Sequence, residues 1–151
     1  MFAKRRRIWV LAAESTRARV TAWDHDTSRL EPVEGLDWSE PHPHGRDINS
    51  ERPGRVRESF GSARHAIEPH TDPVELFERR FATRIATALD ERLQRNEFDR
   101  IIVVAAPATL GRLRHSFSAK LAKVVDSEVG KDLQHLSNHD LAARLKELDR
   151  L

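Results

Sequence analysis

The chain has 151 residues, of which 38% are hydrophobic and 33% are charged, and its 26 basic side chains nearly balance its 24 acidic ones. This length and balance are typical of one soluble domain with its own core, so we expect residues 1–151 to form a single domain. The formal net charge of +2 is too small for nucleic-acid binding through bulk charge, so any such binding has to come from local basic patches.

Features of export, membrane insertion and disulfide chemistry are missing from the sequence. No apolar run approaches the ~20 residues that a membrane-spanning helix needs, and the N-terminus lacks an apolar segment followed by a signal-peptide cleavage site. The chain has no cysteine, which excludes disulfides, thiolate nucleophiles and cysteine-ligated zinc. We therefore expect a cytoplasmic protein without a membrane span.

The first 38 residues predict three antiparallel strands. Residues 8–13 are almost continuously apolar, as in a central strand buried on both faces. Residues 17–23 alternate between small apolar and polar side chains, which predicts a second strand paired with the first through a hairpin. A weaker third strand covers residues 30–36, or extends as far as Trp38, and Pro32 within it predicts an edge position or a bulge.

Helical periodicity begins at residue 72. Asp72, the proline after it and Glu75 form the pattern of a capped helix start. Apolar residues then recur every four positions, which predicts a long amphipathic helix that ends near Asn96. The stripe consists of Phe77, Phe81, Ile85, Leu89 and Leu93.

The remaining pattern alternates between strands and helices. Residues 101–106 are apolar and rich in β-branched side chains, which predicts a central parallel strand. A second helix is expected over residues 110–121, a modest strand over residues 123–129, and a last helix over residues 139–148 with Ser137 or Asn138 as its cap. The order β-β-β-α-β-α-β-α predicts an α/β fold with a mixed sheet, and it is the element order of ribonuclease-H-like folds.

Residues 39–73 connect the third strand to the first helix without a helical or strand period. A connection of about 35 residues within one domain is uncommon and is usually functional or disordered. We interpret this long loop as the functional part of the chain. Its basic residues are His42, His44, Arg46, Arg52, Arg55, Arg57, Arg64, His65 and His70.

The sequence gives little evidence for a metal site. Nucleases of the ribonuclease-H-like fold bind two metal ions with several carboxylates, but here the first strand offers only Glu14, and the fourth strand ends without an acid. His42 with His44, and His70 with Asp72, could supply zinc ligands, but their spacing matches no common zinc module. We therefore expect no metal and no cofactor, and motifs for phosphate-binding loops or nucleophile elbows are also missing.

Anion recognition fits the loop better. Gly61 and the two small residues after it can bring backbone amides close to an anion, while Arg64 can bind phosphate and His65 can exchange a proton near neutral pH. Phe60, just before them, can stack on a base. The alternative is a loop whose arginines pair with its own acidic residues, Glu51, Glu58 and Glu68.

Several stretches together resemble the host attachment protein family, described as required for attachment to host cells, and the similarity covers nearly the whole chain. The matching residues are Trp9 to Ala12, Ser15 to Val20, Gly45 to Asp47, Arg52 to Arg55, Phe60, Gly61, Arg64 to Ala66, Glu68, Pro69, Asp72, Pro73, Phe81, Ala82, Phe98, Asp99, Ala106, Pro107, Leu110, Gly111, Leu113, Arg114 and Lys131 to Leu133.

This family is distantly similar to the central domain of archaeal and eukaryotic peptide-chain release factors. The resemblance implies a loop, between the third strand and the first helix, that enters the ribosome. Release factors carry Gly-Gly-Gln in that loop, whereas this chain has Gly61 followed by Ser-Ala-Arg-His. The departure argues against peptidyl-tRNA hydrolysis and leaves binding as the expectation.

The leading hypothesis is a non-catalytic binding protein that contacts structured RNA, on the ribosome or tRNA. Two alternatives remain: a protein-interaction factor with an indirect role in bacterial attachment to host cells, and a hydrolase that uses His65 as an acid or base. Oligomeric state is not defined by the sequence. The predicted RNA-binding residues are Arg17 and Arg19 on the second strand together with Arg46, Arg52, Arg55, Phe60, Gly61, Arg64 and His65 in the loop.

Overall fold

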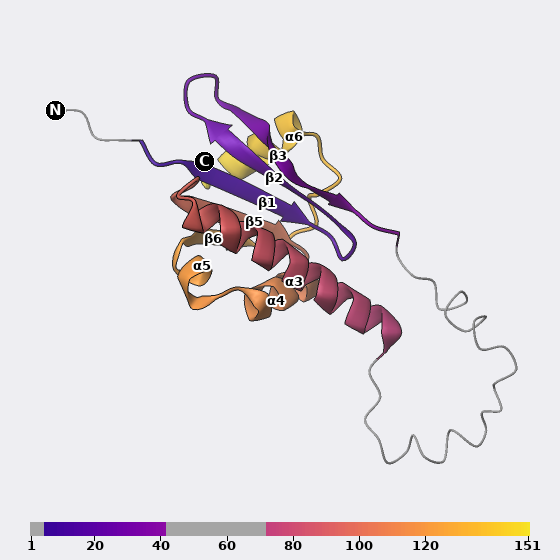
Figure 1. Cartoon of the computed structure of the whole chain (residues 1–151). Helices are drawn as coiled ribbons and strands as arrows, with labels where there is room; N and C mark the ends of the chain where they lie inside the picture. The colour runs from indigo at the N-terminus through magenta and orange to yellow at the C-terminus, as the bar shows by residue number, and fades with distance from the viewer. Residues whose placement is uncertain (1–4, 42–71) are drawn as a thin grey trace, which may run out of the picture.

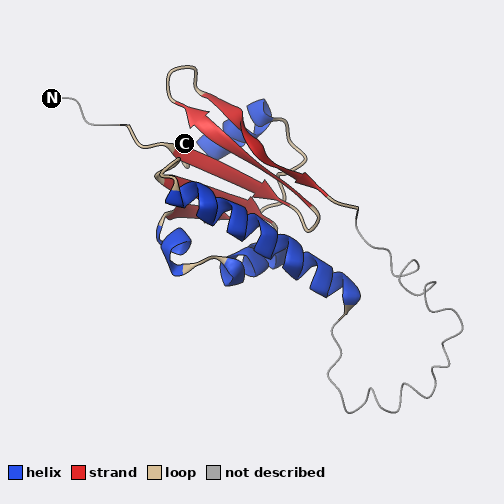
Figure 2. Ribbon diagram, viewed as in Figure 1, coloured by secondary structure: helices blue, strands red, loops and turns tan. Residues whose placement is uncertain are grey.

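A computed structural model describes residues 5–41 and 72–151, and shows a mixed five-stranded sheet with helices on both faces (Figures 1 and 2). The strand order is β3-β2-β1-β5-β6. The elements are β1 (Ile8–Ala13), β2 (Arg17–Asp24), β3 (Arg29–Ser39), α3 (Pro73–Gln94), β5 (Arg100–Ala105), α4 (Pro107–Ser116), α5 (Ala119–Lys123), β6 (Val125–Val129) and α6 (Asn138–Glu147).

Strand β1 lies at the centre of the sheet, as its apolar sequence predicted. It pairs antiparallel with β2 and parallel with β5, and Val10 to Ala12 are fully buried. β5 is the second internal strand, paired in parallel with both β1 and β6. The mixed α/β sheet expected from the element order is therefore confirmed.

Helices cover both faces of the sheet because β1 and β5 are apolar on both sides. α3, α4 and α5 pack on one face, where Phe81, Ile85 and Leu113 belong to the larger core cluster around Trp9 and Leu11. α6 packs on the other face and forms a second cluster with alternate residues of the same strands. Figure 2 shows α3 crossing in front of the strands and α6 behind them.

The helix predicted over residues 110–121 was wrong, because two helices occupy this stretch. α4 ends at Ser116, and Phe117 has extended backbone angles (φ −70°, ψ 139°). Ser118 then caps α5, accepting a hydrogen bond from the Leu121 amide and donating one of 2.7 Å to Asp90 on α3. The apolar spacing is kept across the break, so periodicity alone did not reveal it.

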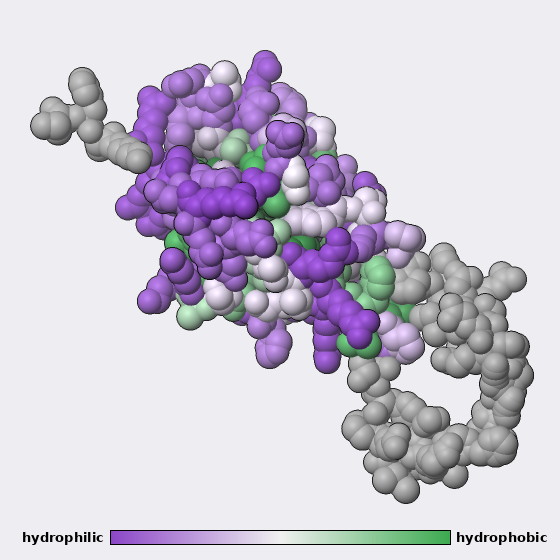
Figure 3. All heavy atoms as spheres, in the orientation of Figure 1, coloured by the Kyte–Doolittle hydropathy of each residue, from purple (hydrophilic) through white to green (hydrophobic). Residues whose placement is uncertain are grey.

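The surface seen in Figure 3 is largely hydrophilic, with hydrophobic residues showing mainly between polar side chains. Within residues 5–41 and 72–151, no helix has the length and apolar character required to cross a membrane.

Strand β3 is an edge strand with an irregular register, as Pro32 predicted. Arg19 of β2 faces Asp37, but Thr21 faces Pro32, so β3 accommodates additional residues between these pairs. Gly35 in this bulge has a φ of +83°, and the Nη2 atom of Arg92 donates a 2.8 Å hydrogen bond to the neighbouring Glu34 carbonyl. Glycine is required here because an L side chain rarely adopts this backbone angle.

We predict that Gly35→Ala destabilises the fold by about 1–2 kcal/mol, because the new side chain is strained at this φ and its Cβ would lie 2.9 Å from Arg92 Nη2. Chemical denaturation measures the effect. Gly111→Ala is the matched control: nothing lies within 4 Å of a Cβ at this helical position, so the exchange should stabilise by about 0.5–1 kcal/mol. Equal stability of Gly35→Ala and wild type would contradict this account of the bulge.

Candidate functional site

The described ends of the long loop lie at one edge of the sheet. β1, β5 and β6 are parallel, and β3 runs in the same direction because both β1 and β3 are antiparallel to β2. The carboxyl ends of these four strands therefore meet at one edge, which we call the carboxyl edge. In open α/β sheets this is the edge at which ligands usually bind.

The chain leaves β3 at the carboxyl edge through a fixed segment. Ser39 pairs with Arg17 of β2, and the Glu40 amide donates a 2.9 Å hydrogen bond to the Thr16 carbonyl. The Glu40 carboxylate forms an ion pair with Arg84 of α3. These contacts attach Glu40, two residues before segment 42–71, to both the β1–β2 hairpin and α3.

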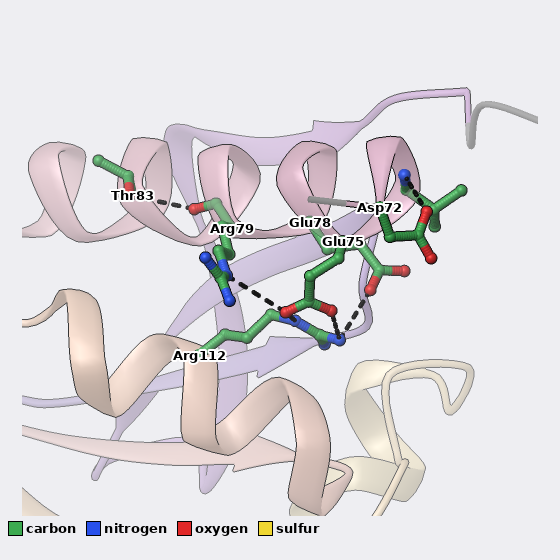
Figure 4. A network of polar contacts seen from close by, with 7 residues as sticks. Asp72, Glu75, Glu78, Arg79, Thr83 and Arg112 are labelled. Atoms are coloured by element: carbon green, nitrogen blue, oxygen red, sulfur yellow. Dashed lines mark hydrogen bonds and ion pairs between the residues drawn. The ribbon is translucent and has the colours of Figure 1, made fainter. Parts of the chain in front are cut away.

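The chain re-enters the fold at the start of α3 through a second fixed point (Figure 4). The Asp72 side chain accepts a 2.9 Å hydrogen bond from the Val74 amide and caps the helix, as predicted. Arg112 of α4 bridges Glu75 and Glu78 with Nη2–O distances of 3.0 and 2.9 Å. The residues that flank segment 42–71 on both sides are thus held at the same edge.

The bridge around Arg112 is electrostatically coupled. The hydrogen bond from Arg112 holds the pKa of Glu75 below its usual value, and Arg79 contributes through a 3.3 Å contact to the same carboxylate. The hydrogen bond with Glu75 in turn raises the pKa of Arg112. Sequence analysis assigned Glu75 only to capping and missed Arg112, because a partner 37 residues away leaves no local signal.

The carboxyl edge has little room on the α3 face. A cavity beside Glu14, Glu78 and Arg112 has a volume of ≈ 10 Å³, enough for about one water molecule. Among residues 5–41 and 72–151, no group of three or more His, Asp or Glu side chains is arranged to hold a metal ion. His42, His44 and His70, weighed as zinc ligands, lie outside the described residues.

A larger groove lies on the α6 face of the carboxyl edge. We call it the Arg17 groove; its volume is ≈ 380 Å³, within the range of small-ligand sites. It is lined by Arg17, Arg19, Asp37, Trp38 and Ser39 from β2 and β3, and by residues 134–138 from the connection between β6 and α6.

Arg19 holds the two walls of the groove together. Its guanidinium donates to the Gln134 carbonyl at 2.5 Å, to the Leu136 carbonyl at 2.7 Å and to Asn138 Oδ1 at 2.9 Å. Burial lowers the pKa of Arg19, while the nearby Asp37 carboxylate opposes this shift. The guanidinium therefore fixes the β6–α6 connection against the sheet.

Arg17 differs from Arg19 in being exposed. Its side chain makes no hydrogen bond or ion pair with another residue of the described ranges, so the guanidinium is open to a ligand. The structure places both of these predicted site residues, two positions apart on β2, at the Arg17 groove. The predicted loop residues Arg46, Arg52, Arg55, Phe60, Gly61, Arg64 and His65 lie outside the described residues.

We predict that Arg112→Ala destabilises the protein by about 1–2 kcal/mol, since hydrogen bonds to charged groups contribute this much and Glu78, only 12% exposed, loses its ion pair. Arg114→Ala is the control, because its pair with Glu128 is more exposed and exposed pairs contribute little. Urea denaturation of both variants measures the difference.

The same comparison has a pH dependence. The pKa of Glu75 is lowered in the folded protein. The contribution of Glu75 to folding stability is therefore fully present above its unfolded-state pKa of about 4.3. It is lost as the pH falls through the folded-state pKa. The stability difference between wild type and Arg112→Ala should therefore shrink in acid. A difference that stays constant from pH 7 to pH 3 would contradict the coupling.

We predict that Arg19→Ala destabilises the protein by about 2–3 kcal/mol, because three hydrogen bonds from a charged donor are lost. Arg19→Lys should recover little of this, since an ammonium group lacks the planar fork of donors. Arg17→Ala, two positions along the same strand, should leave the unfolding midpoint nearly unchanged. Similar losses for the Arg17 and Arg19 variants would refute the division of roles.

Comparison with known proteins places most of the chain in one family. A family model described as "Protein required for attachment to host cells" matches residues 9–145. The match runs from β1 into α6 and includes both the carboxyl edge and the Arg17 groove. No curated protein matches the chain significantly.

Proposed function

The chain belongs to the family of proteins required for attachment to host cells, and we propose that it acts as a non-catalytic binding protein for structured RNA, on the ribosome or tRNA. The proposal concerns the molecular activity; attachment to host cells would then depend on it indirectly.

One observation carries the proposal: the exposed Arg17 lies at the edge where the arginine-rich segment leaves and re-enters the fold. Arg17 pairs in register with Ser39, and Glu40 is fixed one residue further. Segment 42–71 contributes Arg46, Arg52, Arg55 and Arg64 to the sequence between these anchors. Several arginines within one segment suit a phosphate backbone better than a single small anion.

The neighbouring cations support a role for Arg17 over other arginines of the edge. Arg19, Arg84 and Arg112 already bind carbonyl or carboxylate oxygens of the protein. These three guanidinium groups are therefore already paired with oxygen atoms of the protein itself.

The strand order supports a ribonuclease-H-like arrangement, in which the three antiparallel strands precede the two parallel ones. In the order β3-β2-β1-β5-β6 the end of β3 and the start of α3, which flank segment 42–71, lie at the carboxyl edge. A loop in this position is what the resemblance to release factors led us to expect, and it is consistent with a ribosomal partner.

Co-sedimentation with ribosomes and tRNA binding test the proposal. Wild type should bind at about 50 mM salt and lose affinity steeply by about 200 mM. The triple variant Arg52→Ala, Arg55→Ala, Arg64→Ala should lose most binding, and its salt dependence should have a slope smaller by about 2–3, since each phosphate contact contributes about 0.7–0.9.

The matched control removes three exposed charges from elsewhere: Lys120→Ala, Lys123→Ala and Arg150→Ala, on α5 and after α6. It has the same net charge as the loop variant but should bind RNA like wild type. If both triple variants lose RNA binding equally, the loss is explained by net charge and not by the loop arginines. Absence of RNA binding by the wild-type protein would refute the proposal. Recovery of the protein at the cell surface with a protein partner would favour the interaction alternative.

A further inference from the structure

The polar side chains of the sheet wall of the Arg17 groove project from one face of the sheet. Arg19 lies opposite Ala12 of β1, which belongs to the core cluster on the α6 face. Arg17 is two positions away on β2, so its side chain projects to the same face. The residues of β3 directly opposite these two arginines, Asp37 and Ser39, share this face as well. The wall therefore presents two cations, one carboxylate and one hydroxyl on the side of α6.

The carboxylate of this wall, Asp37, is an available hydrogen-bond acceptor. It is exposed and forms no hydrogen bond or ion pair within residues 5–41 and 72–151, although its charge opposes the lowering of the Arg19 pKa. The Arg19 guanidinium donates instead to the connection before α6. A carboxylate diagonal to Arg17 weakens the binding of a phosphate alone, because like charges repel. A ligand suited to the groove therefore carries a hydrogen-bond donor next to its phosphate.

The spacing of Arg17 and Asp37 suits one sugar–phosphate unit of RNA. The two residues are diagonal neighbours across β2 and β3, which places them about 7–8 Å apart. Their side chains can therefore reach the phosphate and the ribose 2′-hydroxyl of the same nucleotide. The groove volume of ≈ 380 Å³ is sufficient for such a unit. The 2′-hydroxyl can donate a hydrogen bond, and it is the group by which proteins distinguish RNA from DNA.

We propose that Asp37 selects RNA over DNA by accepting a hydrogen bond from a ribose 2′-hydroxyl, while Arg17 binds the adjacent phosphate. Asp37 is then a specificity-determining residue of the RNA-binding edge. The inference deepens the proposed function and rests on it for RNA as the ligand.

Fluorescence anisotropy with the full chain and three probes of one hairpin sequence tests the inference. The probes are RNA, DNA and 2′-O-methyl RNA, which keeps the A-form geometry and the phosphates of RNA but has no 2′-hydroxyl donor. Wild type should bind RNA about 10-fold more tightly than either other probe, as expected for a hydrogen bond to a charged acceptor. Because the hydroxyl adds no charge, this ratio should stay constant between about 50 and 200 mM salt.

Variants assign the preference to the carboxylate. Asp37→Ala should bind RNA and 2′-O-methyl RNA with equal affinity, whereas removal of a negative charge alone would tighten the binding of all three probes and keep the ratio. Asp37→Asn retains an oxygen acceptor without the charge, so it should keep part of the preference. Glu31→Ala is the matched control, because Glu31 is an exposed acid of the same strand that lies opposite Ala22, on the α3 face. It should keep the full 10-fold ratio.

The outcomes separate this inference from the proposed function. RNA binding by wild type without preference over the methylated probe would overturn the role of Asp37 and leave the RNA proposal intact. A preference that persists in Asp37→Ala would overturn it as well. A purely structural role beside Arg19 would change the unfolding midpoint of the Asp37 variants but not their ratio of affinities. If wild type binds ribosomes or tRNA but not the RNA hairpin, this inference alone fails; if it binds none of them, both fail.

Discussion

The burial of β1 on both faces is the constraint on which the rest of the structure depends. A central apolar strand needs a neighbouring strand on each side for its backbone and a helical layer on each face, because both faces must be removed from water. β2 and β5 satisfy its backbone, while α3 and α6 contribute to the two clusters on its faces. The direction of β1 also determines which edge receives the ends of the parallel strands.

Charge on the described surface is divided between structural and available cations. Arg7 binds Asp99 at the opposite edge, and Arg19, Arg84 and Arg112 bind oxygens at the carboxyl edge. Each of these guanidinium groups joins segments far apart in the sequence. Arg17 is exposed at the carboxyl edge, so a ligand can be bound there without breaking any described contact that supports the fold.

The proposed RNA binding combines the arginine-rich segment with a fixed cation at the carboxyl edge. The arginine-rich segment would supply most of the attraction to RNA, which is electrostatic and depends on salt. Arg17 would add an exposed cation on β2. The walls of the Arg17 groove are positioned by Arg19, so the groove does not have to form on binding.

Local patterns in the sequence were sufficient to predict most of the helices and strands. Strand and helix periods, the cap at Asp72 and the edge position signalled by Pro32 arise from neighbouring residues, and the structure confirms them. The break at Phe117 escaped prediction because the apolar spacing continues across it, although Ser118 is a local cap for α5.

The candidate site was predictable only in part. Sequence placed Arg17 and Arg19 on one strand face, but it could not distinguish their roles, since the oxygens that engage Arg19 lie 115 to 119 residues away. The sequence by itself determined most helices and strands and the basic character of the loop, because these follow from adjacent residues. Only the tertiary structure decided which arginines are paired within the protein and where the groove lies. Both depend on segments that are far apart in the sequence and meet through folding.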